Sequence, residues 1–254
     1  MKPRRRPLHP LRKGHAPRPS RPRTGPVRDQ REPSLAALVA GAELDLPETV
    51  VDALDAFLVR MLKENEKLNL TGIRDLGRAR ILHALDSLQV WSVVARAPRL
   101  IVDLGSGNGF PGVAAACLWP DARTILVERT HKKAAAIARC LADVGLDRVE
   151  IRDVDASQIH VRSSELLGAC DLVVTRAMCD LDRATQLAAP LLLPTGCTVV
   201  HWKAAELQPE ERSAGVQAAK HFRLLPREDH IYVLPGEGRD PTPRPRRLVS
   251  FVRG

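Results

Sequence analysis

The sequence predicts an α/β fold with a mostly parallel, seven-stranded sheet preceded by a helical segment. Two observations lead to this prediction. From residue 98 onwards, short apolar runs alternate with helical patterns, and a glycine-rich turn follows the first apolar run. Continuously apolar runs of this length are typical of parallel strands covered on both faces. The 254 residues suffice for one sizeable core with an appendage.

Charge divides the chain into a basic tail, residues 1–33, and a neutral remainder. Residues 1–32 contain eleven lysines and arginines against two acids, which leaves 28 of each sign elsewhere. The net charge of +9 therefore belongs to the tail. Because the tail is rich in proline and poor in apolar residues, we expect it to be disordered and to contact nucleic-acid phosphates. A solvated extension, or an artefact of an upstream start codon, is the alternative.

Residues 34–97 are predicted to form a helical subdomain. Asp45-Leu46-Pro47-Glu48 has the form of a capping box, and apolar residues then recur with the helical period to about Asn65. A second helix is predicted over 76–95.

Residues 98–254 are predicted to form the α/β domain. Strands are predicted at 100–104, 123–128, 148–152, 171–175 and 197–202, with helices at 111–118, 130–144 and 180–192 and a shorter one near 156–167. Thr130 is a suitable N-cap and Gly145 a suitable C′ residue for the helix over 130–144. The late runs 231–234 and 248–252 are predicted to pair antiparallel at the sheet edge.

The cysteines and the apolar runs limit the class of protein. Five scattered cysteines without a Cys-x-x-Cys pair indicate a reducing compartment, with neither a disulfide framework nor a metal site. No apolar run is long enough to span a bilayer, and no apolar segment typical of a secretory signal follows the charged N-terminus. We expect a cytoplasmic protein without membrane contact.

The stretch 100–112 joins an apolar strand to a helix through a turn rich in glycine. A strand, turn and helix of this kind form a nucleotide-binding corner of an open α/β sheet. Gly107-x-Gly109-x-x-Gly112 satisfies the dinucleotide fingerprint, and Glu128 lies 21 residues after Gly107. A nicotinamide dehydrogenase is therefore one hypothesis.

Asp103 favours a different ligand for the same turn. A carboxylate at the turn would repel a diphosphate but suits the cationic groups of S-adenosylmethionine (AdoMet). Asp103-x-Gly105-x-Gly107-x-Gly109 is the usual first motif of AdoMet-dependent methyltransferases. Glu128, at the end of the second strand, would then hold the ribose hydroxyls.

Four motifs together resemble the RsmG (GidB) family of 16S rRNA guanine-N7 methyltransferases. They are Asn65-Glu66-Lys67-Leu68-Asn69-Leu70-Thr71, His83-Ala84-Leu85-Asp86-Ser87, the stretch from Asp103 to Gly112, and Thr175-Arg176-Ala177. The resemblance runs from about residue 47 to the late strands and does not include the tail. It implies a Rossmann-like class I methyltransferase fold with an N-terminal helical addition. It also implies AdoMet as cofactor and a guanine near the decoding site as target.

The resemblance also implies positions for the site residues. Cofactor contacts are implied at Gly105, Phe110, Ala156, Ser157 and Arg176. The chain departs from the family pattern twice, with Asp155-Ala156-Ser157 in place of Arg-Ala-Glu or similar and with Lys203-Ala204 in place of Lys-Gly. The first departure removes a glutamate side chain from the adenine side.

Four residues are candidates for positioning the substrate: His83, Asp86, Arg176 and Lys203. Guanine N7 carries a lone pair and no proton, so no general base is required and positioning of N7 remains the main task. His83 and Asp86 share a helix face with Ser87, and without a ligand nearby such a face is an ordinary solvated stripe.

The expected partner is 16S rRNA or the small ribosomal subunit, bound by a monomer. Recognition of an exposed base edge favours a structured RNA target. Two other functions stay open. One is methylation of cytosine C5, with Cys179 as the nucleophile. The other is a non-catalytic RNA-binding or ribosome-assembly factor on a methyltransferase scaffold.

Overall fold

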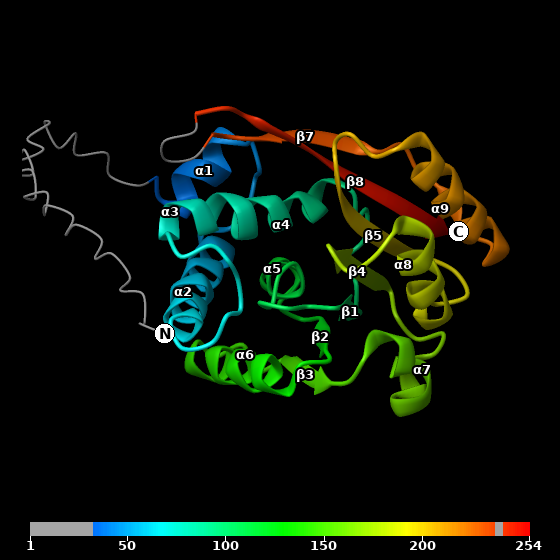
Figure 1. The fold of residues 1–254 in the computed structure, drawn as a ribbon, viewed down its shortest axis with the longest axis horizontal. Coiled ribbons are helices and arrows are strands. Elements are labelled where there is room, and N and C mark those ends of the chain that lie inside the picture. The colour runs from blue at the N-terminus through cyan, green and yellow to red at the C-terminus, as the bar shows by residue number, and fades with distance from the viewer. Residues whose placement is uncertain (1–32, 237–240) are drawn as a thin grey trace, which may run out of the picture. The chain divides into compact units, whose positions relative to one another are not determined.

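A central sheet of eight strands has the order β3-β2-β1-β4-β5-β8-β6, with β7 also paired to β8. The computed structural model describes residues 33–236 and 241–254 (Figure 1). The predicted tail, 1–33, lies outside the described residues except for its last one. The strands are β1 Leu100–Leu104, β2 Arg123–Glu128, β3 Val149–Asp153, β4 Leu172–Arg176, β5 Cys197–Ala204, β6 Leu225–Pro226, β7 His230–Leu234 and β8 Arg244–Arg253.

The first five strands are parallel, and β8 runs antiparallel to β5. An antiparallel pair is present at the sheet edge as predicted, but its partners differ. Residues 231–234 of β7 pair with residues 244–247 of β8, whereas the predicted partner run 248–252 pairs with β5 and β6. The prediction of seven strands was wrong by one. The short strand β6 pairs with a later part of β8, so the outer edge is divided into two strands.

Nine α-helices of the described residues connect or precede these strands. They are α1 Leu35–Gly41, α2 Glu48–Asn65, α3 Leu76–Ala79, α4 Asp86–Leu88, α5 Gly112–Leu118, α6 His131–Asp143, α7 Ile159–Arg162, α8 Leu181–Ala188 and α9 Pro209–His221. The sequence analysis did not predict α9, because that helix buries only Gly215 and Ala219 and therefore lacks a pronounced apolar stripe.

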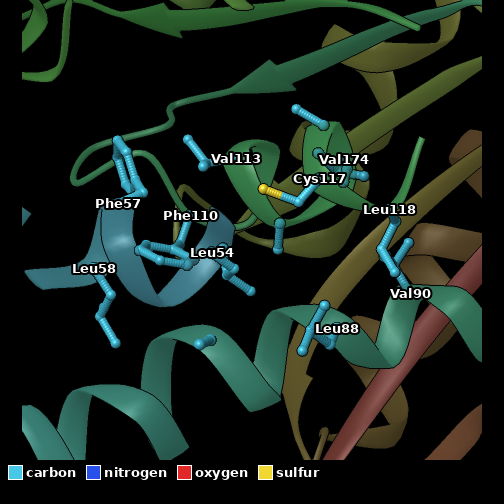
Figure 2. Packing of buried hydrophobic residues seen from close by; sticks show 14 of the residues in the cluster. Leu54, Phe57, Leu58, Leu88, Val90, Phe110, Val113, Cys117, Leu118 and Val174 are labelled. Carbon is cyan, nitrogen blue, oxygen red and sulfur yellow. The ribbon is translucent and has the colours of Figure 1, made fainter. Parts of the chain in front are cut away.

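Each face of the sheet has its own hydrophobic cluster. Helices α2, α5 and α6 cover one face, and α8 and α9 cover the other (Figure 1). The N-terminal helices contribute directly to the first cluster, where Leu54 and Phe57 of α2 pack close to Phe110 (Figure 2). The rings of Phe57 and Phe110 have centroids 5.7 Å apart. The helical segment therefore shares its core with the sheet.

The second N-terminal helix differs from the expectation of one regular helix over 76–95. A π-helical segment, Arg80–Leu85, separates α3 from α4, and a 3₁₀ turn ends the run at Ser92. The N–H of Asp86 at the end of this segment donates to the Ile81 carbonyl oxygen, five residues back, and π-helical segments are frequent at functional sites.

The predicted capping box at the start of α2 is absent. The N-cap residue is Pro47, which makes no side-chain hydrogen bond to the helix. Proline has a fixed φ that suits the start of a helix, and Glu48 supplies the acidic residue of the first turn. At α6, Thr130 occupies the predicted N-cap position without a side-chain bond, and Gly145 has the positive φ expected of a C′ residue.

Candidate active site

A cleft of about 430 Å3 lies at the carboxyl ends of the parallel strands. It is lined by the turn after β1, the end of β2, the segments after β3 and β4, the first turn of α6 and one face of α8. Four of the predicted cofactor residues line it: Gly105, Glu128, Ala156 and Ser157. Parallel strands bring these segments to one edge, which is where open α/β sheets bind their ligands.

The glycine turn is tied to the end of β2. The backbone N–H groups of Gly105 and Ser106 both donate to the carbonyl oxygen of Val127 at 2.9 Å. Glu128 Oε2 accepts from the N–H of Gly107 at 3.0 Å, and Oε1 accepts from the N–H of Thr130 at 2.7 Å. The φ of Gly105 is +76°, a conformation that glycine adopts without strain. Glu128 therefore fixes the shape of the turn and faces the cleft.

Asp103 lies behind the cleft and does not line it. Its side chain is fully buried, and Oδ2 accepts from the N–H of Gly112 at 2.7 Å at the start of α5. Burial raises the pKa of Asp103 to about 7. Its Oδ1 atom is buried without a hydrogen-bond partner, as is the Ser106 hydroxyl. The turn thus contains two polar atoms whose hydrogen-bonding capacity is unused.

Phe110 and Arg176 also lie outside the cleft lining. The Phe110 ring is buried in the first hydrophobic cluster (Figure 2), and its carbonyl oxygen accepts from Arg176 Nη2 at 3.3 Å. Arg176 Nη1 lies 3.1 Å from both Asp86 Oδ2 and Ser87 Oγ. Arg176 therefore joins the tip of β4 to α4 and to the glycine turn.

Asp86 is the centre of a buried group of four side chains, called here the Asp86 cluster: Asp86, Arg176, Trp202 and Tyr232. The Tyr232 hydroxyl donates to Asp86 Oδ1 at 2.7 Å, and Trp202 Nε1 donates to the Asp86 carbonyl oxygen at 2.9 Å. The helix face that bears His83, Asp86 and Ser87 is buried, so the interpretation as a solvated stripe was wrong. The sequence analysis did not find Trp202 and Tyr232, because neither belongs to a recognisable motif.

His83 is held neutral beside this cluster. Burial, with a further contribution from Arg176, lowers the pKa of His83 to about 3. Its Nε2 atom lies 3.0 Å from Thr71 Oγ1, and its ring stacks on Phe110 with centroids 5.7 Å apart. His83 thus packs the π-helix against the glycine turn and does not line the cleft.

Lys203 is fully engaged within the protein. Its ammonium donates to the carbonyl oxygen of Cys179 at 2.9 Å and to Glu211 Oε1 at 2.6 Å. Because Cys179 lies in the segment after β4 that lines the cleft, Lys203 positions this segment. In the turn after β3, Asp155 Oδ1 accepts from the backbone N–H and the hydroxyl of Ser157, so its carboxylate closes a short turn.

Three basic residues also line the cleft: Arg129, Lys133 and Arg183. None of them was identified from the sequence. A positional signal existed, because each lies within a few residues of the carboxyl end of a parallel strand. Among the described residues, no group of three histidine, cysteine or acidic side chains is placed to hold a metal ion.

Comparison with known proteins identifies the family. Residues 51–225 match the family model of rRNA small subunit methyltransferase G. The chain belongs to this family. A ribosomal RNA small subunit methyltransferase G of Leptothrix cholodnii is 36% identical over 174 residues, which cover 65% of this chain and 77% of the relative. That of Sorangium cellulosum is 33% identical over 218 residues, covering 84% and 90%.

Solved structures agree with the methyltransferase fold. A precorrin-6y C5,15-methyltransferase of Geobacter metallireducens has a TM-score of 0.51 at 13% identity, covering 67% of this chain and 87% of that one. The tRNA methyltransferase TrmK of Bacillus subtilis has a TM-score of 0.51 at 12% identity, covering 68% of each chain. The predicted fold class and membership of the methyltransferase G family are both confirmed. None of the helices in residues 33–236 and 241–254 has the length and apolarity that crossing a bilayer requires.

Proposed function

We propose that this protein transfers a methyl group from AdoMet to N7 of a guanine in 16S rRNA. The observation that carries the proposal is the Glu128 carboxylate, fixed at the lip of the cleft by the glycine turn of a methyltransferase G family member. We infer further that a cytoplasmic monomer acts on 16S rRNA or on the small subunit, and that the guanine lies near the decoding site.

The residues of the cleft fit AdoMet. Each Glu128 oxygen accepts one backbone N–H and keeps a second acceptor position for a ribose hydroxyl. Asp103, which was predicted to contact the cofactor, does not line the cleft and instead accepts from the N–H of Gly112 at the start of α5. Ala156 and Ser157 line the adenine side, where backbone groups replace the glutamate that is missing from this chain.

The same turn does not fit a dinucleotide. Diphosphates are held by free backbone N–H groups at a glycine turn. Here the N–H groups of Gly105, Ser106, Gly107 and Gly109 all donate within the protein, and that of Gly112 donates to Asp103. The Glu128 carboxylate would also face the diphosphate, so the dehydrogenase hypothesis is disfavoured.

The chemistry requires positioning and no proton transfer. AdoMet, when bound, supplies an electrophilic methyl group on sulfur, and guanine N7 attacks with its lone pair. The segment after β4, held by Lys203, limits the cleft at Cys179. Burial raises the pKa of Cys179, so its thiol stays protonated, which argues against the cytosine-C5 alternative.

Two glycine variants test the site. Gly105→Ala places a Cβ 3.1 Å from Met178 Cγ, in the cleft lining, whereas Gly145→Ala meets nothing within 4 Å. Both glycines have positive φ, so the backbone strain is matched. We expect Gly105→Ala to lose AdoMet binding in calorimetry and Gly145→Ala to retain it. Equal binding by the two variants would place the cofactor elsewhere.

The reaction is tested by mass-spectrometric mapping of 7-methylguanosine in 16S rRNA. Cells without the gene should lack one such residue, and the wild-type gene should restore it while the Gly105→Ala gene does not. An unchanged pattern in the deleted strain would contradict the proposed reaction. AdoMet binding without any methylation would support the non-catalytic scaffold.

A further inference from the structure

The cations of the cleft stand on two opposite walls. Lys133 is the third residue of α6, which follows β2, and Arg183 is the third residue of α8, which follows β4. Both side chains line the cofactor cleft. The glycine turn after β1 lies between these walls, because β1 pairs with β2 on one side and with β4 on the other.

Lys133 is half-buried in the cleft wall and has no partner among the described residues. Among residues 33–236 and 241–254, it is the one lysine or arginine that is partly buried and yet forms no hydrogen bond or ion pair. Lys203, which is also partly buried, is paired with Glu211 at 2.6 Å. Because the Lys133 ammonium has no acceptor within the described protein, it is available to donate charge-assisted hydrogen bonds to an anionic ligand.

Arg183 faces the same space from the other wall. It is exposed and makes no hydrogen bond or ion pair with the described residues. The pKa of Asp155, across the cleft, is lowered first by its bonds to Ser157 and then by Arg129 and Arg183. Arg129 lies 3.9 Å from the Asp155 carboxylate. The acids of the cleft thus already have partners, and two cations remain unmatched.

The cofactor does not account for both of these cations. AdoMet carries a sulfonium and an ammonium against one carboxylate and has no phosphate, whereas RNA carries one phosphate per nucleotide. We propose that Lys133 and Arg183 bind phosphates of the target RNA strand across the mouth of the cleft. The inference rests on the proposed function and adds the residues that hold the strand while its guanine enters the cleft.

The test measures RNA affinity against salt for full-length Lys133→Gln, Arg183→Gln and the double variant, with 16S rRNA as the probe. Each lost phosphate contact should weaken binding roughly tenfold. It should also reduce the slope of log Kd against log salt by about 0.7, and by about 1.4 in the double variant. AdoMet affinity by calorimetry should be retained, while KM for RNA rises.

Lys220→Gln and Arg227→Gln are the matched controls. Both side chains are exposed and have no partner among the described residues. Lys220 lies in α9, and Arg227 lines a separate cleft with residues 91–95, which precede β1 at the opposite edge of the sheet. Both controls should keep the wild-type salt slope.

Two results would overturn the inference. One is an unchanged salt slope in the double variant, and the other is a loss of AdoMet affinity without a loss of RNA affinity, which would assign the cations to the cofactor. Either result leaves the proposed function intact if the variants still methylate. Absence of AdoMet binding and of methylation in the wild type would instead contradict the proposed function itself.

Discussion

The Asp86 cluster and the cations of the cleft walls differ in whether their charges are paired within the protein. In the Asp86 cluster, the carboxylate is buried and meets Arg176 at 3.1 Å and Tyr232 at 2.7 Å. On the cleft walls, Lys133 and Arg183 have no partner among the described residues. Buried charges are tolerated when they are paired and hydrogen-bonded, so the first group stabilises the fold and the second is free for a ligand.

The difference also separates residues that look alike in sequence. Arg176 and Arg183 lie on one short segment, yet one bonds to the Leu82 and Phe110 carbonyl oxygens inside the protein and the other is exposed. A substitution in the Asp86 cluster should therefore change stability, and a substitution on the cleft walls should change binding.

Asp86→Asn should have the largest effect. It leaves the Arg176 guanidinium buried without its carboxylate, and breaking a buried pair in this way costs about 3–5 kcal/mol of unfolding free energy. Urea denaturation measures the loss. The control is Asp52→Asn, which changes an exposed acid of α2. It should change the unfolding free energy by less than about 0.5 kcal/mol. Equal losses in the two variants would remove the distinction between the groups.

Acid should destabilise the protein partly through His83, which neighbours the Asp86 cluster. The pKa of His83 is lowered from 6.5 to about 3. Between these pH values the unfolded chain binds a proton on His83 that the folded chain does not bind. Stability from this group is complete above pH 6.5 and is lost as the pH falls towards 3, at about 1.4 kcal/mol per pH unit. His83→Gln should flatten the curve of unfolding free energy against pH in this range. An unchanged slope would mean that His83 is protonated in the folded state.

Tyr232→Phe should have a smaller effect than Asp86→Asn. It removes one hydroxyl donor from Asp86 Oδ1 and leaves the ion pair with Arg176 in place. A hydrogen bond to a charged group contributes about 1.5 kcal/mol, which thermal or urea unfolding resolves. A loss as large as that of Asp86→Asn would show that the cluster acts as a single unit and that its contributions are not additive.

Lys133→Gln should have the smallest effect on stability. Because Lys133 forms no ion pair with the described residues, its removal should change the unfolding free energy by less than about 0.5 kcal/mol, while RNA binding weakens. A marked destabilisation would show that Lys133 supports the fold, and the contrast with Asp86 would then fail.

The sequence alone predicted the fold class, the family and the edge of the sheet at which the candidate cleft lies. Strand periodicity and the glycine turn place Gly105, Glu128, Ala156 and Ser157 at the carboxyl ends of parallel strands, and the topology then brings them to one cleft. These predictions succeeded because they depend on local spacing and on a sheet topology with few alternatives.

Only the tertiary structure decided what each charged residue meets. Helical spacing placed His83 and Asp86 on one face, but Tyr232 of β7 and Trp202 of β5, more than 100 residues later in the chain, bury that face. The packing of α9 beside the end of β5 likewise pairs Lys203 with Glu211, while Lys133 stays unpaired among the described residues in the cleft. Local spacing determines which side chains share a face, while desolvation and pairing depend on the segments that pack against it.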